Sequence, residues 1–173
     1  AGLVGDVGSS DNDSWIYEMS GYWPFGEDKC VYNTMAEHKA NGGTWFGAYT
    51  AEGDLTTGKR DDIVNTANDI YNDPDISYQA GDAMTYESDP GPTIEVDEIA
   101  GLRCDGLVEY CYEKNGVDVW GRTDNGDQSG TPQHFDVSVT AWVSEHADLG
   151  KDEPWKELCP YVQRGGGYAD SPY

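Results

Sequence analysis

Basic residues are scarce in this chain of 173 residues, which has 10 lysines and arginines against 33 aspartates and glutamates. The formal net charge is −23 at pH 7, and the acidic residues are spread along the whole sequence. Such a surface repels nucleic acids and anionic membranes, so we expect neither as a partner. It suits high salt, which screens the repulsion, or divalent cations, which bridge carboxylates.

Long hydrophobic runs are also missing, and none approaches the ~20 apolar residues that a membrane-spanning helix needs. The sequence therefore predicts no membrane insertion. It shows no signal peptide either, and we expect a mature, secreted, extracellular protein whose leader has been removed. The length of 173 residues is enough for a genuine core, so we predict a single domain over residues 1–173.

Cysteine and histidine are few, with four and three copies. No Cys-x-x-Cys or His-x-x-x-His pair occurs, which excludes the usual zinc spacings. A helix through Cys104 and Cys111 would separate their Cα atoms by about 10 Å, beyond the roughly 7 Å limit for a disulfide. Two disulfides could still join these two cysteines to Cys30 and Cys159 in either order, unless Cys104 is a free nucleophile.

Three acidic turns are candidates for calcium, because each places oxygen ligands on alternate residues. None has the glutamate that closes an EF-hand loop, so an Asx-type turn is the alternative for each of them. Calcium is the only cofactor that the sequence suggests, and the catalysis predicted below requires none. The six candidate ligands are Asp11, Asp13, Asp73, Asp75, Asp124 and Asp127.

The most informative stretch, residues 103–113, places a cysteine where a helix should begin. Acidic and apolar side chains recur on separate stripes at helical spacing, and Asn115-Gly116 ends the run. Cys104 is therefore predicted to be the first residue of a helix over residues 104–113. Unpaired backbone N–H groups, the positive end of the helix dipole and adjacent Arg103 should lower the pKa of its thiol and favour the nucleophilic thiolate.

The same stretch is similar to the nucleophile motif of the NlpC-type papain-like cell-wall peptidases. That motif is a cysteine, a small or polar residue, Gly-Leu-Val and an aromatic residue two positions further on, which residues 104–108 and Tyr110 match. Asp105 replaces the usual serine. The chain resembles the circularly permuted branch, in which a strand beginning His-x-Gly and a strand ending in glutamate precede the cysteine helix. Residues 1–5 and 15–19 occupy those places here.

The resemblance implies an α+β, papain-like fold in which a small antiparallel sheet packs with helices and the nucleophile stands at a helix N-terminus. It also implies a cysteine hydrolase acting on cell-wall peptide or amide bonds. The permuted family's histidine would stand immediately before Ala1, so the base is expected among the histidines of the chain. We predict Cys104, His134 and His146 as catalytic residues. His134 is preferred, because it opens an alternating strand downstream of the cysteine, as in the unpermuted family.

A second function stays open, because a papain-like site without its histidine should be nearly inert. The chain would then be a non-catalytic relative, an extracellular structural or assembly protein stabilised by salt or calcium. Its partners would be copies of itself, in a homo-oligomer or filament. The six tryptophans and twelve tyrosines would suit such contacts.

Hydrophobic periodicity predicts the other elements. The clearest amphipathic helix is at residues 61–71, where apolar residues recur at helical spacing. The sequence predicts strands at residues 2–7, 15–19, 45–49 and 134–143, helices at 29–39, 61–71 and 104–113, and a long loop at 72–92.

Overall fold

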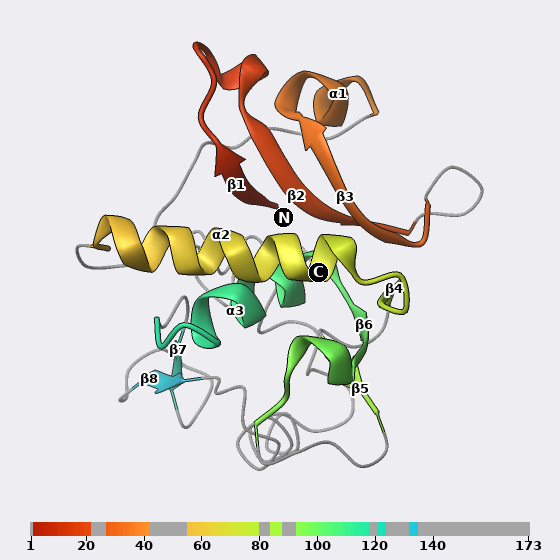
Figure 1. The fold of residues 1–173 in the computed structure, drawn as a ribbon, viewed down its shortest axis with the longest axis vertical. Coiled ribbons are helices and arrows are strands. Elements are labelled where there is room, and N and C mark those ends of the chain that lie inside the picture. The colour runs from red at the N-terminus through yellow and green to blue at the C-terminus, as the bar shows by residue number, and fades with distance from the viewer. Residues whose placement is uncertain are drawn as a thin grey trace.

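The computed structural model describes residues 2–21, 27–41, 55–79, 84–87 and 93–117, together with the backbone of residues 121–123 and 132–134. These parts form an α+β structure with three helices and three small sheets (Figure 1). The α+β class is therefore confirmed. No helix in these ranges is both long and apolar enough to cross a membrane.

The first sheet has the order β1-β2-β3, and both of its strand pairs are antiparallel. This confirms the small antiparallel sheet and the strands predicted at residues 2–7 and 15–19. Tyr17 and Met19 of β2 face the main core, whereas Ile16 and Glu18 point to the opposite face. The bounds are Leu3–Asp6 for β1, Trp15–Ser20 for β2 and Lys29–Thr34 for β3, with a 3-10 helix η1 at Asp11–Asp13 between the first two.

The helix predicted at residues 29–39 is wrong in its first half. Residues 29–34 form β3, which pairs with β2, and only Met35–Ala40 form helix α1. A capping box fixes where the helix begins, since Thr34 Oγ1 accepts from the Glu37 N–H at 3.2 Å and Glu37 Oε2 accepts from the Thr34 N–H at 2.9 Å. Asn41 follows as the C-cap.

The second sheet is mixed, with the order β4-β6-β5. Strands β4 and β6 are parallel, and β5 is antiparallel to β6. The loop predicted at residues 72–92 is therefore wrong in part, because it contains β4 and β5. The bounds are Ser77–Tyr78 for β4, Met84–Tyr86 for β5 and Ile99–Leu102 for β6, with a 3-10 helix η2 at Val96–Glu98 just before β6.

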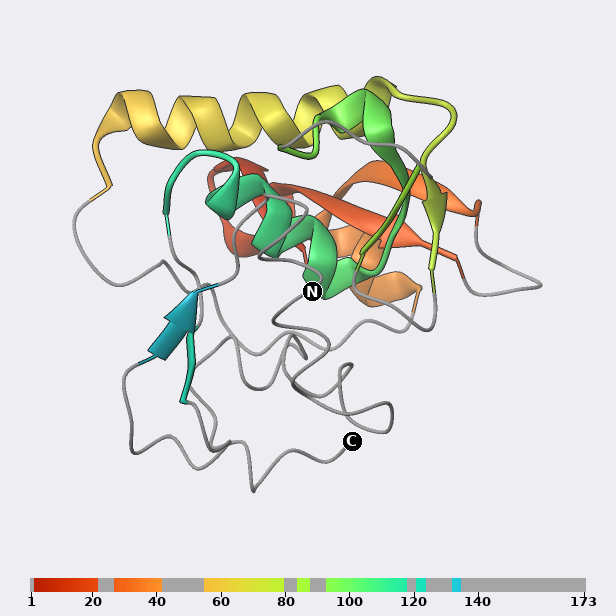
Figure 2. The same cartoon turned by 90° about the horizontal axis from the view of Figure 1, so that it is seen from below.

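Helix α2 spans Thr57–Asn72 and includes the helix predicted at residues 61–71. It begins earlier than predicted because Thr56 is its N-cap, with the side-chain oxygen accepting from the Lys59 N–H at 3.2 Å. Its buried residues, Ile63, Thr66, Ala67 and Ile70, lie on one side of the helix. Figure 2 shows α2 lying along one face of the first sheet, with α1 on the other side.

Helix α3 spans Cys104–Glu113, as predicted, and Gly116 with φ 66° follows it in the left-handed conformation that glycine favours. Leu107, Tyr110 and Cys111 are fully buried in a core shared with α2 and the inner face of the first sheet. The core thus fixes α3 against β2, with the side chain of its first residue directed at that strand.

The third sheet pairs β7 (Gly121–Thr123) with β8 (Pro132–His134) in antiparallel fashion. In Figures 1 and 2 this pair lies toward the C-terminal end of α3. Only residue 134 of the strand predicted at 134–143 is described, and the strand predicted at 45–49 lies outside the described ranges.

Candidate functional site

Cys104 opens α3, half-buried against strand β2. Its Sγ–H donates to the Met19 carbonyl oxygen at 3.2 Å, and Met19 itself is buried. The first intrahelical bond of α3 runs from the Leu107 N–H to the Arg103 carbonyl at 2.9 Å, so the N–H groups before Leu107 face the helix start. That of Gly106 donates to Asp105 Oδ1 at 3.0 Å. The predicted placement of the sulfur at a helix N-terminus is thus confirmed.

The predicted low pKa of Cys104 is wrong, because the pKa of its thiol is raised above the ordinary 9.0. Burial is the largest cause, since it removes water from the thiolate, and the carboxylates of Asp105 and Glu18 add to it. The Arg103 guanidinium is engaged by Asp105, with Nε–Oδ1 at 2.7 Å and Nη2–Oδ2 at 2.9 Å. Cys104 is therefore a thiol at neutral pH and needs a base before it can attack.

The Arg103–Asp105 pair should contribute strongly to stability, because the two side chains are only 13% and 3% exposed. We expect Arg103→Ala to lower the free energy of unfolding by about 3 kcal/mol, since it removes one partner of a buried, bidentate ion pair. Urea denaturation followed by circular dichroism measures this loss. Arg60→Ala is the matched control, because Arg60 is exposed and its Nε donates to the Leu55 carbonyl at 3.3 Å. Equal losses in the two variants would contradict the expectation.

A histidine–carboxylate pair that the sequence analysis missed joins α1 to β2, the strand that Cys104 contacts. His38 Nδ1 in α1 is 2.6 Å from Glu18 Oε2 in β2, and the two side chains are 24% and 14% exposed. Glu18 precedes Met19 in β2 and points to the opposite face of the sheet, and after burial its charge adds to the rise in the pKa of Cys30 and of Cys104. The sequence signal for this pair is the capping box of Thr34 and Glu37. It begins the helix at Met35 and thereby sets the position of His38.

The two predicted bases lie outside the part of the chain that surrounds Cys104 in the described structure. His134 ends β8, opposite Gly121, and only its backbone is described, while His146 lies outside the described residues. The β7–β8 pair lies toward the C-terminal end of α3 in both views, and Cys104 is at the other end (Figures 1 and 2). A role for His134 or His146 as the base stays a prediction.

Cys30, Cys104 and Cys111 are all free thiols. Cys104 and Cys111 share helix α3, which agrees with the prediction that they cannot bridge each other. Neither of them is joined to Cys30, so the alternative with two disulfides is not present in this structure, and Cys159 lies outside the described residues. A free Cys104 is what a nucleophilic role requires.

Two of the three predicted calcium turns are described, and a carboxylate in each is used within its own turn. Asp13 Oδ2 accepts from two serine hydroxyls at 2.8 and 2.9 Å, which lowers its pKa. Asp73 Oδ1 accepts from the Asp75 N–H at 2.9 Å, an Asx turn. Asp124 and Asp127 lie outside the described residues. In the part that is described, no three His, Cys, Asp or Glu side chains are placed to hold a metal, and calcium binding stays a prediction.

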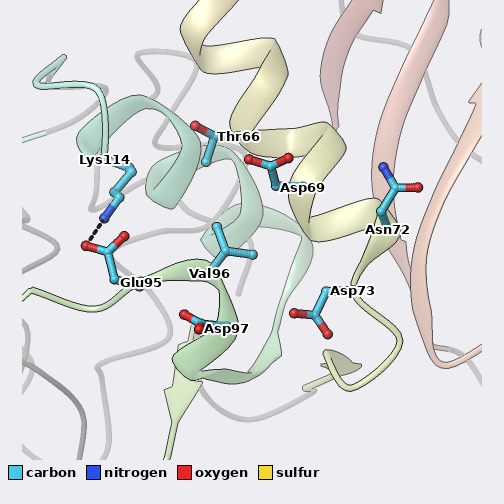
Figure 3. Close-up of a pocket in the computed structure, with 8 residues that line it drawn as sticks. All are labelled: Thr66, Asp69, Asn72, Asp73, Glu95, Val96, Asp97 and Lys114. Carbon is cyan, nitrogen blue, oxygen red and sulfur yellow. Dashed lines mark ion pairs between the residues drawn. The ribbon is translucent and has the colours of Figure 1, made fainter.

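An acidic pocket of about 450 Å³ lies at another place, between α2, η2 and the end of α3 (Figure 3). Lys114 Nζ is 2.7 Å from Glu95 Oε1, and three other carboxylates share the pocket with this pair. Cys104 does not line it, so the pocket is separate from the thiol. The lining residues are Thr66, Asp69, Asn72, Asp73, Glu95, Val96, Asp97 and Lys114.

The carboxylates that line this pocket lead us to expect that removing one of them stabilises the protein. Asp69 stands in the last turn of α2, where the helix dipole and the neighbouring carboxylates both disfavour a negative charge. Asp69→Asn should raise the melting temperature by about 1–2 °C at low ionic strength, and added salt should shrink the gain. Asp61→Asn, nearer the start of the same helix, is the control and should give no gain. Scanning calorimetry at low and high salt makes the comparison, and a gain that salt leaves unchanged would contradict it.

The thiol site thus comprises Cys104 of α3 and the Met19 carbonyl of β2 that accepts from it, two residues far apart in the sequence. The Glu18–His38 pair joins α1 to β2 at the neighbouring residue of that strand. Comparisons of the chain with protein-family models, with curated proteins and with solved structures found no match.

Proposed function

We propose that this protein is a secreted cysteine hydrolase of papain-like fold that cleaves an amide or peptide bond, with Cys104 as its nucleophile. One observation carries the proposal: the Cys104 sulfur is a free, half-buried thiol at the N-terminal end of α3, 3.2 Å from the Met19 carbonyl of the adjacent strand. The similarity of residues 103–113 to the NlpC nucleophile motif supports a cell-wall peptide or amide as substrate.

In the proposed reaction a base takes the Cys104 proton and the sulfur attacks the substrate carbonyl carbon. The backbone N–H groups at the start of α3 stabilise the oxyanion that forms. The amine leaves with the proton from the base, and water then hydrolyses the thioester to release the acid. Activation breaks the hydrogen bond from Cys104 to the Met19 carbonyl, so this bond holds the resting thiol in its inactive, protonated form.

Three positions are candidates for the base. His134 is preferred and His146 is the second candidate, while the resemblance would bring a histidine in from the start of β1. That strand start lies beside Glu18, since a β-carbon at Gly2 would lie 3.7 Å from the Glu18 Cβ. A loss of turnover in His134→Ala or in His146→Ala would identify that histidine as the base. A histidine added before Ala1, with glutamine there as the control, tests the third position.

Alkylation tests the proposed nucleophile. The purified chain is treated with iodoacetamide, the modified cysteines are identified by peptide mass spectrometry, and release of new amines from disaccharide-peptide fragments of peptidoglycan is measured. Cys104 should react before the buried Cys30 and Cys111, and turnover should fall in proportion to its modification. Turnover that persists with Cys104 fully alkylated would contradict the proposal.

The raised pKa of Cys104 favours a second candidate, a non-catalytic extracellular assembly protein of the same fold. A thiol that stays protonated and hydrogen-bonded to the Met19 carbonyl needs no catalytic partner. On this account the protein forms homo-oligomers or filaments, and salt or calcium strengthens them by screening or bridging its carboxylates. Sedimentation velocity across titrations of sodium chloride and calcium tests this, and a monomer throughout would contradict it.

A further inference from the structure

Cys104 and Cys30 meet at the same residue of β2. The Cys104 Sγ is 3.2 Å from the Met19 carbonyl oxygen. Cys30 of β3 stands directly opposite Met19 in the antiparallel pairing, an arrangement that places two Cα atoms about 4.5–5.5 Å apart. Both cysteines therefore lie next to Met19, although 74 positions separate them in the sequence.

The surroundings of Cys30 make it the natural partner for Cys104. Cys30 is a member of the main apolar core, and Cys104 packs against that core. Cys111 lies about 10 Å along the helix from Cys104, so it cannot bridge Cys104 itself.

Exposure sets the order in which the two thiols would react. Cys104 is half-buried, whereas Cys30 is only 2% exposed. A small disulfide from solution therefore meets Cys104 first, and Cys30 is positioned to react second from inside the core.

We propose that Cys104 and Cys30 form a reversible disulfide on exposure to a low-molecular-weight disulfide such as oxidised glutathione. The Cys104 thiolate attacks one sulfur of the small disulfide, which gives a mixed disulfide and releases one small thiol. The Cys30 thiolate then attacks the Cys104 sulfur and releases the second small thiol. Two protein thiols are oxidised to one disulfide, and one small disulfide is reduced to two thiols. Formation of the disulfide does not depend on the proposed function. Its consequence for catalysis rests on that function, because the disulfide would block the proposed nucleophile.

Disulfide mapping of the full chain tests the proposal. The reduced protein is equilibrated in buffers of reduced and oxidised glutathione, its remaining thiols are alkylated in acid, and its peptides are analysed by mass spectrometry. We expect a peptide pair linked through Cys30 and Cys104, which dithiothreitol removes. No linked pair, or Cys104 linked to Cys159 instead, would overturn the proposal.

Two variants sharpen the test. Cys30→Ser should stop at the first step and accumulate glutathione on Cys104, whereas Cys111→Ser should still form the linked pair. If Cys30→Ser does not fold, Cys30→Ala is used in its place. In either case the disulfide map of the unchanged protein decides whether the proposal holds. Turnover without the disulfide would overturn this inference alone, and the disulfide in a protein without turnover would overturn only the proposed function.

Discussion

Turnover of a peptidoglycan-type amide should fall by at least about 10³-fold when serine replaces Cys104. The serine hydroxyl can still donate to the Met19 carbonyl, which Cys104 contacts at 3.2 Å, so the local structure should survive. A hydroxyl gives up its proton far less readily than a thiol, however, and the nucleophile is lost. Values of kcat/KM from chromatographic detection of the released amine measure the effect.

Cys111→Ser is the matched control for this substitution. It makes the same chemical change in the same helix, but at a fully buried residue about 10 Å from Cys104 along the axis. We expect this variant to be less stable, with its kcat/KM changed far less once the folded fraction is taken into account. Similar kcat/KM values for the unchanged protein and Cys104→Ser would contradict the assignment of Cys104.

Alkaline solution should destabilise the protein steeply, because burial raises the pKa of several of its thiols and phenols. The pKa of Cys30 rises from 9.0 to about 12, through burial first and then the charges of Glu18 and Cys104. The folded state thus prefers the protonated thiol. Its contribution is complete below pH 9 and is lost as the pH rises toward 12. A shift of this size corresponds to about 4 kcal/mol, and the raised pKa values of Cys111 and Tyr110 act in the same direction.

Urea unfolding at a series of pH values from neutral to about 12 measures this loss. Cys30→Val is the control, because valine fills a similar space without an ionisable group. The variant should lose about 4 kcal/mol less than the unchanged protein over the same pH range. Parallel curves for the two proteins would show that ionisation of Cys30 does not cause the alkaline loss.

Elements whose signals are local could be predicted from the sequence. Helix α3 begins at Cys104 and ends before Gly116, as its stripes and its glycine stop indicate. Strand β3 could not be predicted in this way, because Val31, Met35 and His38 also fit a helix spacing, and only pairing with β2 decides for the strand. Strands β4 and β5 have two and three residues, too few for periodicity to show.

The candidate site likewise has one part that local sequence predicts and another that depends on the folded structure. The position of Cys104 at a helix start followed from its own stretch of sequence, but the direction of its pKa shift did not. Burial against Met19, the carboxylate of Glu18 and the pairing of Arg103 with Asp105 all depend on the folded structure. The contact between Glu18 and His38 also depends on it, since the pairing of β3 with β2 brings α1, which carries His38, back to Glu18 of β2.

The most direct test of the central claim is the mass of the peptide that contains Cys104 after the reaction with substrate is quenched in acid. The account predicts an acyl group on Cys104 as a thioester during turnover, removable by hydroxylamine and absent from Cys104→Ser. Turnover with no acyl group on Cys104 at any time, an acyl group on a different residue, or no turnover at all would contradict it.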